Sequence, residues 1–380
     1  RRATFSILAV VVCLAGLAGA QNRIDPGVIE KIRAEGMDRS KAWQTFDYLV
    51  TTIGPRLTNS PAHRRAATWT QDQLKALGLA NVHAEGFEFG RGWTLNKISI
   101  EMVEPRYMPL IGYAKGWSPS TAGRLVAAPT WMPGLEPDAM KAQAGKLKGA
   151  ILFTSPIQEY AIRADRDPAG GDLKAPSPRP AGPPAMNAER LAALKAEGVG
   201  VTIEPNIGEH GTLFVTGRDG GANSVPSIVL ASEHYNLIAR MLEAKVPVKL
   251  AVELQATFNT DDTKALNVIA DLPGTDPALK DEIVMVGGHL DSWHTGTGAT
   301  DNADGVTTII EAMRILKTLG IQPRRTIRAA LWAGEEQGLL GSKAYVEQHL
   351  TGDANKAARD RLSVYFNLDN GYPQIGRAHV

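Results

Sequence analysis

The chain has 380 residues, of which 43% are hydrophobic and 21% charged, which is enough for two globular units and too ordinary for a disordered, collagenous or coiled-coil protein. Forty-one basic residues against 40 acidic ones give a formal net charge of +1, so we expect no nucleic acid as a partner. The single cysteine, Cys13, excludes a disulfide framework and a cysteine-rich metal site, so a metal would need His, Asp and Glu ligands.

Residues 1–20 have the pattern of a secretory signal peptide. Arg1 and Arg2 precede the apolar run 5–17, and the small residues 18–20 form a cleavage site. The run is shorter than the roughly 20 residues that cross a bilayer, and a buried N-terminal helix is the alternative interpretation. We therefore expect a secreted or periplasmic protein with no membrane span after signal cleavage.

The segment from residue 24 to residue 79 is predicted to be helical. Ser40 can cap one helix, and Ser60-Pro61 begins a second helix that Gly78 ends. From about residue 93 the sequence pattern changes to short β-rich runs, at 95–102, 149–154, 198–203, 227–230 and 248–258. Two helices interrupt these runs, at 188–197 and 233–244, and the proline-rich stretch 167–184 is interpreted as a surface loop.

After residue 262 the pattern alternates between strands and helices. Strands are predicted at 267–272, 282–287, 326–333 and 363–368, and helices at 306–319 and 339–350. Such alternation is typical of an α/β sheet that helices cover on both faces.

Polar residues follow the predicted strands at the points where sites form in α/β sheets. They are His289, Asp291, Asp301, Glu335, Glu336 and Asp369. Five carboxylates beside one imidazole would repel each other strongly without a cation. This donor set suits zinc, manganese or cobalt, and the number of acids indicates two ions with one bridging carboxylate.

Each of these residues also has an ordinary structural interpretation. His289 alone could be a hydrogen-bonded histidine, Asp301 a helix N-cap, and Asp369 a turn residue. The pair Glu335-Glu336 could be an acidic first helical turn. Their joint occurrence at successive strand ends favours the metal site, and the spacing of Asp291 from His289 would let that carboxylate hold the imidazole in place.

Three motifs resemble metallopeptidase family twenty-eight, the co-catalytic zinc exopeptidases. They are GGHLDSW at 287–293, GATDNADG at 298–305 and WAGEEQGLLGS at 332–342. Residues 53–57 are similar to the opening segment of the family, and 105–258 resembles an inserted, β-rich protease-associated domain. The resemblance implies an aminopeptidase-like α/β/α sandwich that is split between residues 21–104 and 259–373.

The resemblance also implies roles for the site residues. His289 and Asp369 would bind the first Zn²⁺, Glu336 the second, and Asp301 would bridge both ions. Asp291 would orient His289, and Glu335 would be the general base that takes a proton from the attacking water. The expected substrates are short peptides or dipeptides, and a homodimer is compatible with the sequence.

The C-terminal end departs from the family pattern. The family takes its last zinc ligand from a histidine beyond the end of this sequence. Residues 375–380 are the translation of a common sequencing-adapter sequence, so we expect 374–380 to be a non-native tail and the native protein to continue after Pro373.

Two other functions remain as alternatives. A glutaminyl-cyclase-like acyltransferase would share the fold, although such enzymes lack an insert like 105–258. A non-catalytic, receptor-like binding module would also share it, although the intact Glu335 and four metal ligands disfavour this. Trp293 is expected to line a pocket or to pack at a strand end, and His294 is expected in a pocket or at the surface.

Overall fold

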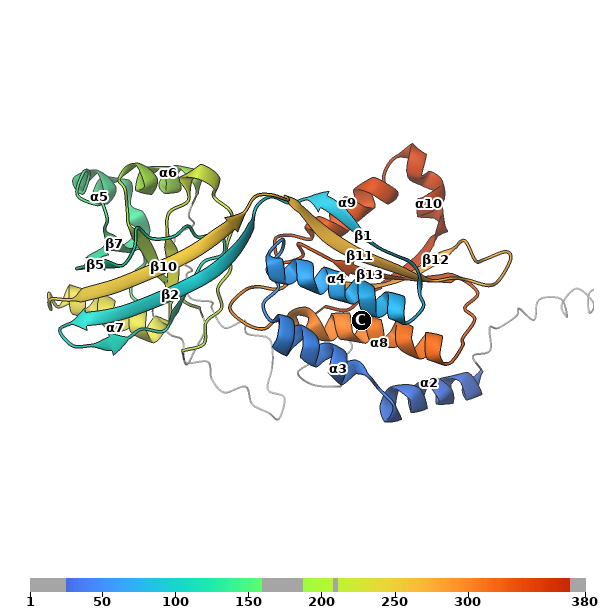
Figure 1. The fold of residues 1–380 in the computed structure, drawn as a ribbon. Helices are drawn as coiled ribbons and strands as arrows, with labels where there is room; N and C mark the ends of the chain where they lie inside the picture. Colours follow the sequence, from blue (N-terminus) through green and yellow to red (C-terminus); the bar gives the residue numbers. More distant parts are fainter. Residues whose placement is uncertain (1–24, 159–186, 208–210, 370–380) are drawn as a thin grey trace, which may run out of the picture.

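The computed structural model describes residues 25–158, 187–207 and 211–369. Figure 1 shows two lobes, which we call the main lobe (25–91 and 260–369) and the outer lobe (92–259). The predicted signal peptide, the predicted loop 167–184 and the predicted tail 374–380 lie outside the described residues. No helix in the described part of the chain is both long enough and apolar enough to cross a membrane.

The main lobe is built on a five-stranded mixed sheet. Its strands lie in the order β1 (Ala80–Glu88), β11 (Lys264–Leu272), β13 (Thr326–Trp332), β12 (Ile283–His289) and β14 (Leu362–Asn367). β13, β12 and β14 run parallel to one another, whereas β11 and β1 are antiparallel to their neighbours. The carboxyl ends of the three parallel strands therefore meet at one edge of the sheet.

Helices cover both faces of this sheet, as predicted. On one face, α4 (Pro61–Ala76) and α8 (Asp304–Thr318) pack against Val268 and Ala270 of β11. On the other face, Tyr345 of α9 (Leu340–His349) packs against Ile269, which lies between Val268 and Ala270 along β11. Because successive strand side chains point to opposite faces, these contacts define a three-layer α/β/α sandwich.

The N-terminal region confirms the predicted helices with changes in detail. It contains α2 (Pro26–Asp38), α3 (Ala42–Asp47), a π-helical turn, η2 (Tyr48–Ile53), and α4. Ser60 caps α4 by accepting a hydrogen bond from the His63 amide, with Pro61 at the first helical position. Gly78 follows the helix with a φ of +73°, which glycine adopts without steric cost.

The outer lobe contains two sheets that face each other. One has the order β3 (Met108–Pro109), β2 (Gly92–Glu104), β10 (Lys249–Asn259), β5 (Leu125–Ala127). The second has the order β4 (Gly112–Ala114), β9 (Ser227–Leu230), β8 (Val201–Pro205), β7 (Ile151–Phe153), β6 (Thr130–Trp131). Three helices flank them: α5 (Pro137–Ala142), α6 (Ala188–Ala196) and α7 (Ser232–Glu243). The identity of this lobe as a protease-associated domain stays a prediction.

The long strands β2 and β10 connect the lobes. They pair along their whole length and continue out of the outer lobe toward β1 and β11 of the main sheet (Figure 1). β2 begins at Gly92, before residue 105, where the sequence placed the start of the insert, and the domain boundaries stay a prediction. The segment 80–88 was not predicted as a strand, because its residues do not alternate between apolar and polar.

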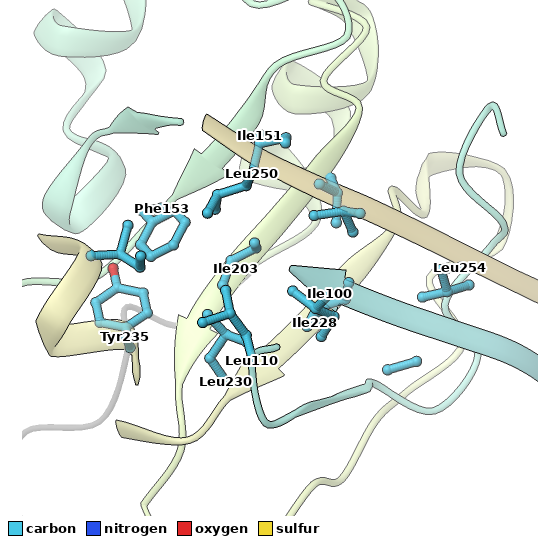
Figure 2. Close-up of a cluster of buried hydrophobic side chains, with 14 of the residues drawn as sticks. Ile100, Leu110, Ile151, Phe153, Ile203, Ile228, Leu230, Tyr235, Leu250 and Leu254 are labelled. Carbon is cyan, nitrogen blue, oxygen red and sulfur yellow. The ribbon is translucent and has the colours of Figure 1, made fainter. Parts of the chain in front are cut away.

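The core of the outer lobe is a layer of aliphatic side chains between its two sheets. Figure 2 shows Ile100 and Leu250 of one sheet facing Ile203 and Ile228 of the other, with all four buried. Tyr235 of α7 closes one end of the layer and stacks on Phe153 at a centroid distance of 4.8 Å. Its hydroxyl donates to the Ser155 carbonyl at 2.6 Å and accepts from the Ser155 amide at 2.8 Å.

Tyr235→Phe tests this anchor of the outer lobe. The change leaves the buried amide and carbonyl of Ser155 without the hydroxyl, so we expect the free energy of unfolding to fall by about 1–3 kcal/mol. Urea denaturation followed by circular dichroism measures it. The matched control is Tyr107→Phe at a position that is 68% exposed, for which we expect a change of less than about 0.5 kcal/mol. Equal losses in the two variants would contradict the role of the Tyr235 hydroxyl.

Candidate metal centre

The candidate site lies at the edge where the three parallel strands of the main sheet end. His289 is the last residue of β12, Glu335 and Glu336 follow β13, and Asp369 follows β14. Asp301 comes from a short π-helical turn, η5 (Ala299–Ala303), immediately before α8. The structure thus brings together the residues that the sequence predicted, because adjacent parallel strands deliver their following residues to the same edge.

The imidazole of His289 is at the centre of the cluster and is almost completely buried. Its Nε2 atom lies 2.9 Å from Asp301 Oδ1, 3.2 Å from Asp369 Oδ1 and 3.9 Å from Glu335 Oε2. Its Nδ1 atom hydrogen-bonds to the backbone carbonyl of Asp291 at 3.0 Å. One ring nitrogen is therefore held by the backbone, and the other points at the carboxylates.

Asp291 has more partners than the sequence predicted for it. Its carboxylate is fully buried and accepts hydrogen bonds from the Thr58 hydroxyl at 2.8 Å and from the amides of Glu335 at 3.2 Å and Glu336 at 3.3 Å. Its distance to His289 Nδ1 is longer, at 3.6 Å. Asp291 therefore positions the segment after β13 as well as the imidazole, which its backbone carbonyl contacts directly.

Glu335 and Glu336 are adjacent in sequence but have different surroundings. The amide of Trp293 donates to Glu336 Oε1 at 3.3 Å, which ties this side chain to the loop after β12. Burial raises the pKa of Glu336 to about 8, and the charges of Asp301 and Asp291 add to this effect. Burial also raises the pKa of Glu335, against the opposing influence of His289.

The crowded carboxylates raise the pKa of the His289 imidazole. Burial alone would lower the pKa of the His289 imidazole. Its contacts with Asp291 and Asp301 outweigh burial and raise the pKa to about 11. Acidic groups that crowd together in a low-dielectric site repel one another and favour a nearby positive charge, which agrees with the raised pKa values of His289 and Glu336.

The donor atoms fit a transition-metal ion. His289, Asp301 and Glu336 offer ligand atoms that all lie within 4.8 Å of one another, and so do His289, Glu335 and Asp369. Asp301 Oδ1 is buried and has no hydrogen-bond partner among the described residues, although His289 Nε2 is close to it. A buried carboxylate oxygen of this kind needs a cation, and imidazole with carboxylates is a donor set that zinc accepts.

A cavity of about 970 Å³ lies beside the cluster, between the two lobes. Trp293, Glu336 and Gln337 line it from the main lobe, and residues that include Lys115 and Asp219 line it from the outer lobe. Trp293 both lines this cavity and packs against the core of the outer lobe, so each of the two alternatives predicted for it applies. His294 is instead buried, and its Nε2 atom contacts the carbonyl of Ala114 at 2.8 Å, so it is neither a surface residue nor a lining residue of this cavity.

Sequence reasoning missed the residues that hold the cluster from outside. Thr58 contacts Asp291, and Asn302 bridges the start of α8 to the end of β14 by accepting from the Gly305 amide and donating to the Leu368 carbonyl. Arg56 contacts the loop after β12. Arg56 lies in the segment 53–57 that is similar to the opening segment of a family, and Asn302 lies in the motif at 298–305, but neither likeness gave these side chains a role. Thr58 lies outside both segments.

Comparisons with known proteins agree with the resemblance that the sequence motifs indicated. Residues 267–375 match the model of Peptidase family M28. Carboxypeptidase Q of Mus musculus is 28% identical over 344 residues, which cover 88% of this chain and 66% of the mouse protein. The chain thus spans just under two thirds of the length of that curated relative.

Solved structures have the same fold. A peptidase M28 precursor from Shewanella amazonensis has a TM-score of 0.64 at 27% identity, covering 90% of this chain and 73% of that one. A zinc aminopeptidase from Bacillus subtilis has a TM-score of 0.54 at 21% identity, covering 87% of this chain and 68% of that one. These similarities confirm the predicted aminopeptidase-like fold.

Asp291→Asn tests the link between the two strand ends. The carboxamide nitrogen cannot accept a hydrogen bond, so one of the three donors on Asp291 loses its partner, and we expect the free energy of unfolding to fall by about 1–3 kcal/mol. Urea denaturation in a chelator measures this without any contribution from metal. The control is Asp281→Asn at a side chain that is 65% exposed, with an expected change within about 0.5 kcal/mol. A loss at Asp291 no larger than the control would contradict this role.

Proposed function

Because residues 267–375 belong to Peptidase family M28, we propose that this chain is a zinc-dependent exopeptidase that hydrolyses peptide bonds in short peptides or dipeptides. The observation that carries the proposal is the placement of one buried imidazole and four carboxylates at the edge of the sheet, with donor atoms close enough to share metal ions. The similarity to carboxypeptidase Q over most of the chain supports the same conclusion.

We propose that the site holds two zinc ions. His289 and Asp369 would bind one ion, Glu336 would bind the other, and Asp301 would lie between them. The contact of His289 with both Asp301 and Asp369 supports the first set, and the grouping of Asp301 with Glu336 supports the bridging position. Bound zinc would supply a Lewis acid that polarises the scissile carbonyl and makes the attacking water more acidic.

Glu335 is the proposed general base. Its side chain is partly exposed and borders the cluster, with Oε2 at 3.9 Å from His289 Nε2. Its raised pKa brings the carboxylate closer to the range in which a base works at neutral pH. Glu335 would take the proton from the attacking water and return it to the leaving amine, while Asp291 holds the backbone amide of Glu335 in place.

The position of the site favours the end of a peptide over the middle of a long chain. Glu336 lines a cavity that the outer lobe bounds on the opposite side, so a substrate has to enter between the lobes. A chain end fits such a space more easily than a continuous strand does. The proposal also includes export of the protein through the signal at 1–20. Hydrolysis of a panel of free, N-acetylated and C-amidated dipeptides would show which peptide terminus is recognised.

Glu335→Gln tests the general base. The variant keeps the size of the side chain and touches none of the four proposed metal ligands. We expect kcat on the best dipeptide of the panel to fall by about 10²- to 10⁴-fold, with metal content per chain retained. Stopped peptide-hydrolysis assays and elemental analysis measure the two quantities.

The control for Glu335→Gln is Glu347→Gln, an exposed residue of α9 for which we expect unchanged kcat. Full hydrolysis by Glu335→Gln would refute its role. Cyclisation of N-terminal glutamine by the unsubstituted chain without peptide hydrolysis would replace the proposed reaction with that of a cyclase.

Asp301→Ala tests the bridging ligand. Removing a carboxylate that serves both ions should release both, so we expect metal content to fall from two ions per chain toward none. Elemental analysis after dialysis measures the loss. The control is Asp304→Asn, three residues further on and outside both groups of donors, which should keep its metal. Loss of a single ion from Asp301→Ala would show that this carboxylate serves one ion only.

A further inference from the structure

Arg56 is a buried arginine that has no acidic partner in contact. Its side chain has no exposed surface, and none of the ion pairs within 4.0 Å among the described residues involves it. Every hydrogen bond of its guanidinium goes to a backbone carbonyl. The acceptors are Leu290 at 2.9 Å, Leu49 at 3.3 Å, Gly54 at 2.9 Å, Thr297 at 2.9 Å and Gly298 at 2.8 Å.

Three of these carbonyls belong to the loop 290–298, which connects the end of β12 to the turn that carries Asp301. Leu290 lies between His289 and Asp291, and Gly298 immediately precedes η5. One planar guanidinium therefore spans the two ends of this loop. Because its donors have a fixed fork geometry, the distance between the loop ends is set by a rigid group rather than by the loop itself.

The backbone of Arg56 makes a second attachment to the middle of the same loop. The Arg56 amide donates to the Ser292 hydroxyl at 3.0 Å, and the Ser292 amide donates to the Arg56 carbonyl at 3.2 Å. The packing is tight at Gly298, where φ is +62° and an added Cβ would lie 2.7 Å from the Arg56 Nη2 atom and 2.5 Å from Ser292 Cβ. The loop thus has room for one arrangement only.

The guanidinium also carries a positive charge that interacts with the acidic cluster. Burial lowers the pKa of Arg56 to about 10, and the charges of Asp291, Asp301 and Glu336 oppose this shift. Arg56 is therefore still a cation at neutral pH. Its positive charge offsets part of the negative charge of these carboxylates.

We propose that Arg56 is a positioning residue of the metal site: it holds loop 290–298 so that His289 and Asp301 stand at ligand distance before a metal arrives. This inference rests on the proposed function, because it concerns the same site. Without the guanidinium, five carbonyl oxygens each lose a hydrogen-bond donor and the two ends of the loop are free to separate. The ligands would then have to be ordered at the moment of binding, which weakens the affinity for metal.

The test compares zinc affinity in the metal-free full chain and in Arg56→Lys. Lysine keeps the charge but has no planar fork and too few donors for five carbonyls. We expect the affinity for zinc to fall by about 10- to 100-fold, measured by competition with a chromogenic zinc chelator. Melting temperatures of the metal-free proteins are recorded alongside, so that loss of stability and loss of affinity are separated.

The matched control is Arg328→Lys. Arg328 lies on β13 and forks onto Asp271 at 2.7 Å and 2.8 Å, with a third bond to the Tyr345 hydroxyl at 2.9 Å. It is near the start of the strand, away from the edge that carries the site. We expect this variant to lower the melting temperature while its zinc affinity stays within about twofold of the unsubstituted chain. A purely structural role for Arg56 predicts the same behaviour in both variants.

Ser292→Ala carries the test if Arg56→Lys does not fold. It removes the hydroxyl that accepts from the Arg56 amide, and we expect about three- to tenfold weaker zinc binding. Unchanged affinity in Arg56→Lys, or in Ser292→Ala where the lysine variant does not fold, would overturn the inference and leave the proposed function intact. Failure of the unsubstituted chain to bind zinc would overturn both.

Discussion

The mutual repulsion of carboxylates around one buried imidazole is the constraint on which the main lobe depends. Asp301, Glu335 and Asp369 all have an oxygen within 4 Å of His289 Nε2, at an edge where burial weakens solvent screening. Burial and the neighbouring acids raise the pKa of Glu336, and contacts with the acids raise the pKa of His289 against the effect of burial. The rest of the lobe has to hold these groups together against that repulsion.

The fold opposes this repulsion with neutral hydrogen-bond donors and with one buried cation. Backbone amides of the segment after β13 and the Thr58 hydroxyl satisfy Asp291, so one acid of the cluster is fully hydrogen-bonded inside the protein. Arg56 adds a fixed positive charge. Asp301, Glu336 and Asp369 remain as the proposed metal ligands, and this division separates the carboxylate that builds the site from the carboxylates that would bind metal.

Most of the site residues could be predicted from the sequence because they lie at the end of an apolar strand, and strand periodicity is a local signal. Asp301 was instead predicted at the start of the helix that follows the glycine-containing loop. His289, Glu336 and Asp369 were placed together by topology alone, since parallel neighbours end at a common edge. Thr58 and Arg56 could not be found in this way, because they precede Asp291 by more than 200 residues and lie in a segment without regular structure. Strand β1 was missed for a related reason, as its pairing with β11 rather than its own pattern makes it a strand.

The charges of the outer lobe restrict which ligands the cavity attracts, in addition to the metal chemistry of the site. Two of the cations that line the cavity have acidic partners in the outer lobe: Lys115 pairs with Glu204 at 2.7 Å, and Arg91, at the end of a main-lobe segment, pairs with Asp219 through two hydrogen bonds. Paired charges leave this wall nearly neutral, so it offers little attraction for a polyanion, which agrees with the overall charge of +1. Near the cavity the unbalanced charge is then that of the acidic cluster, which attracts cations.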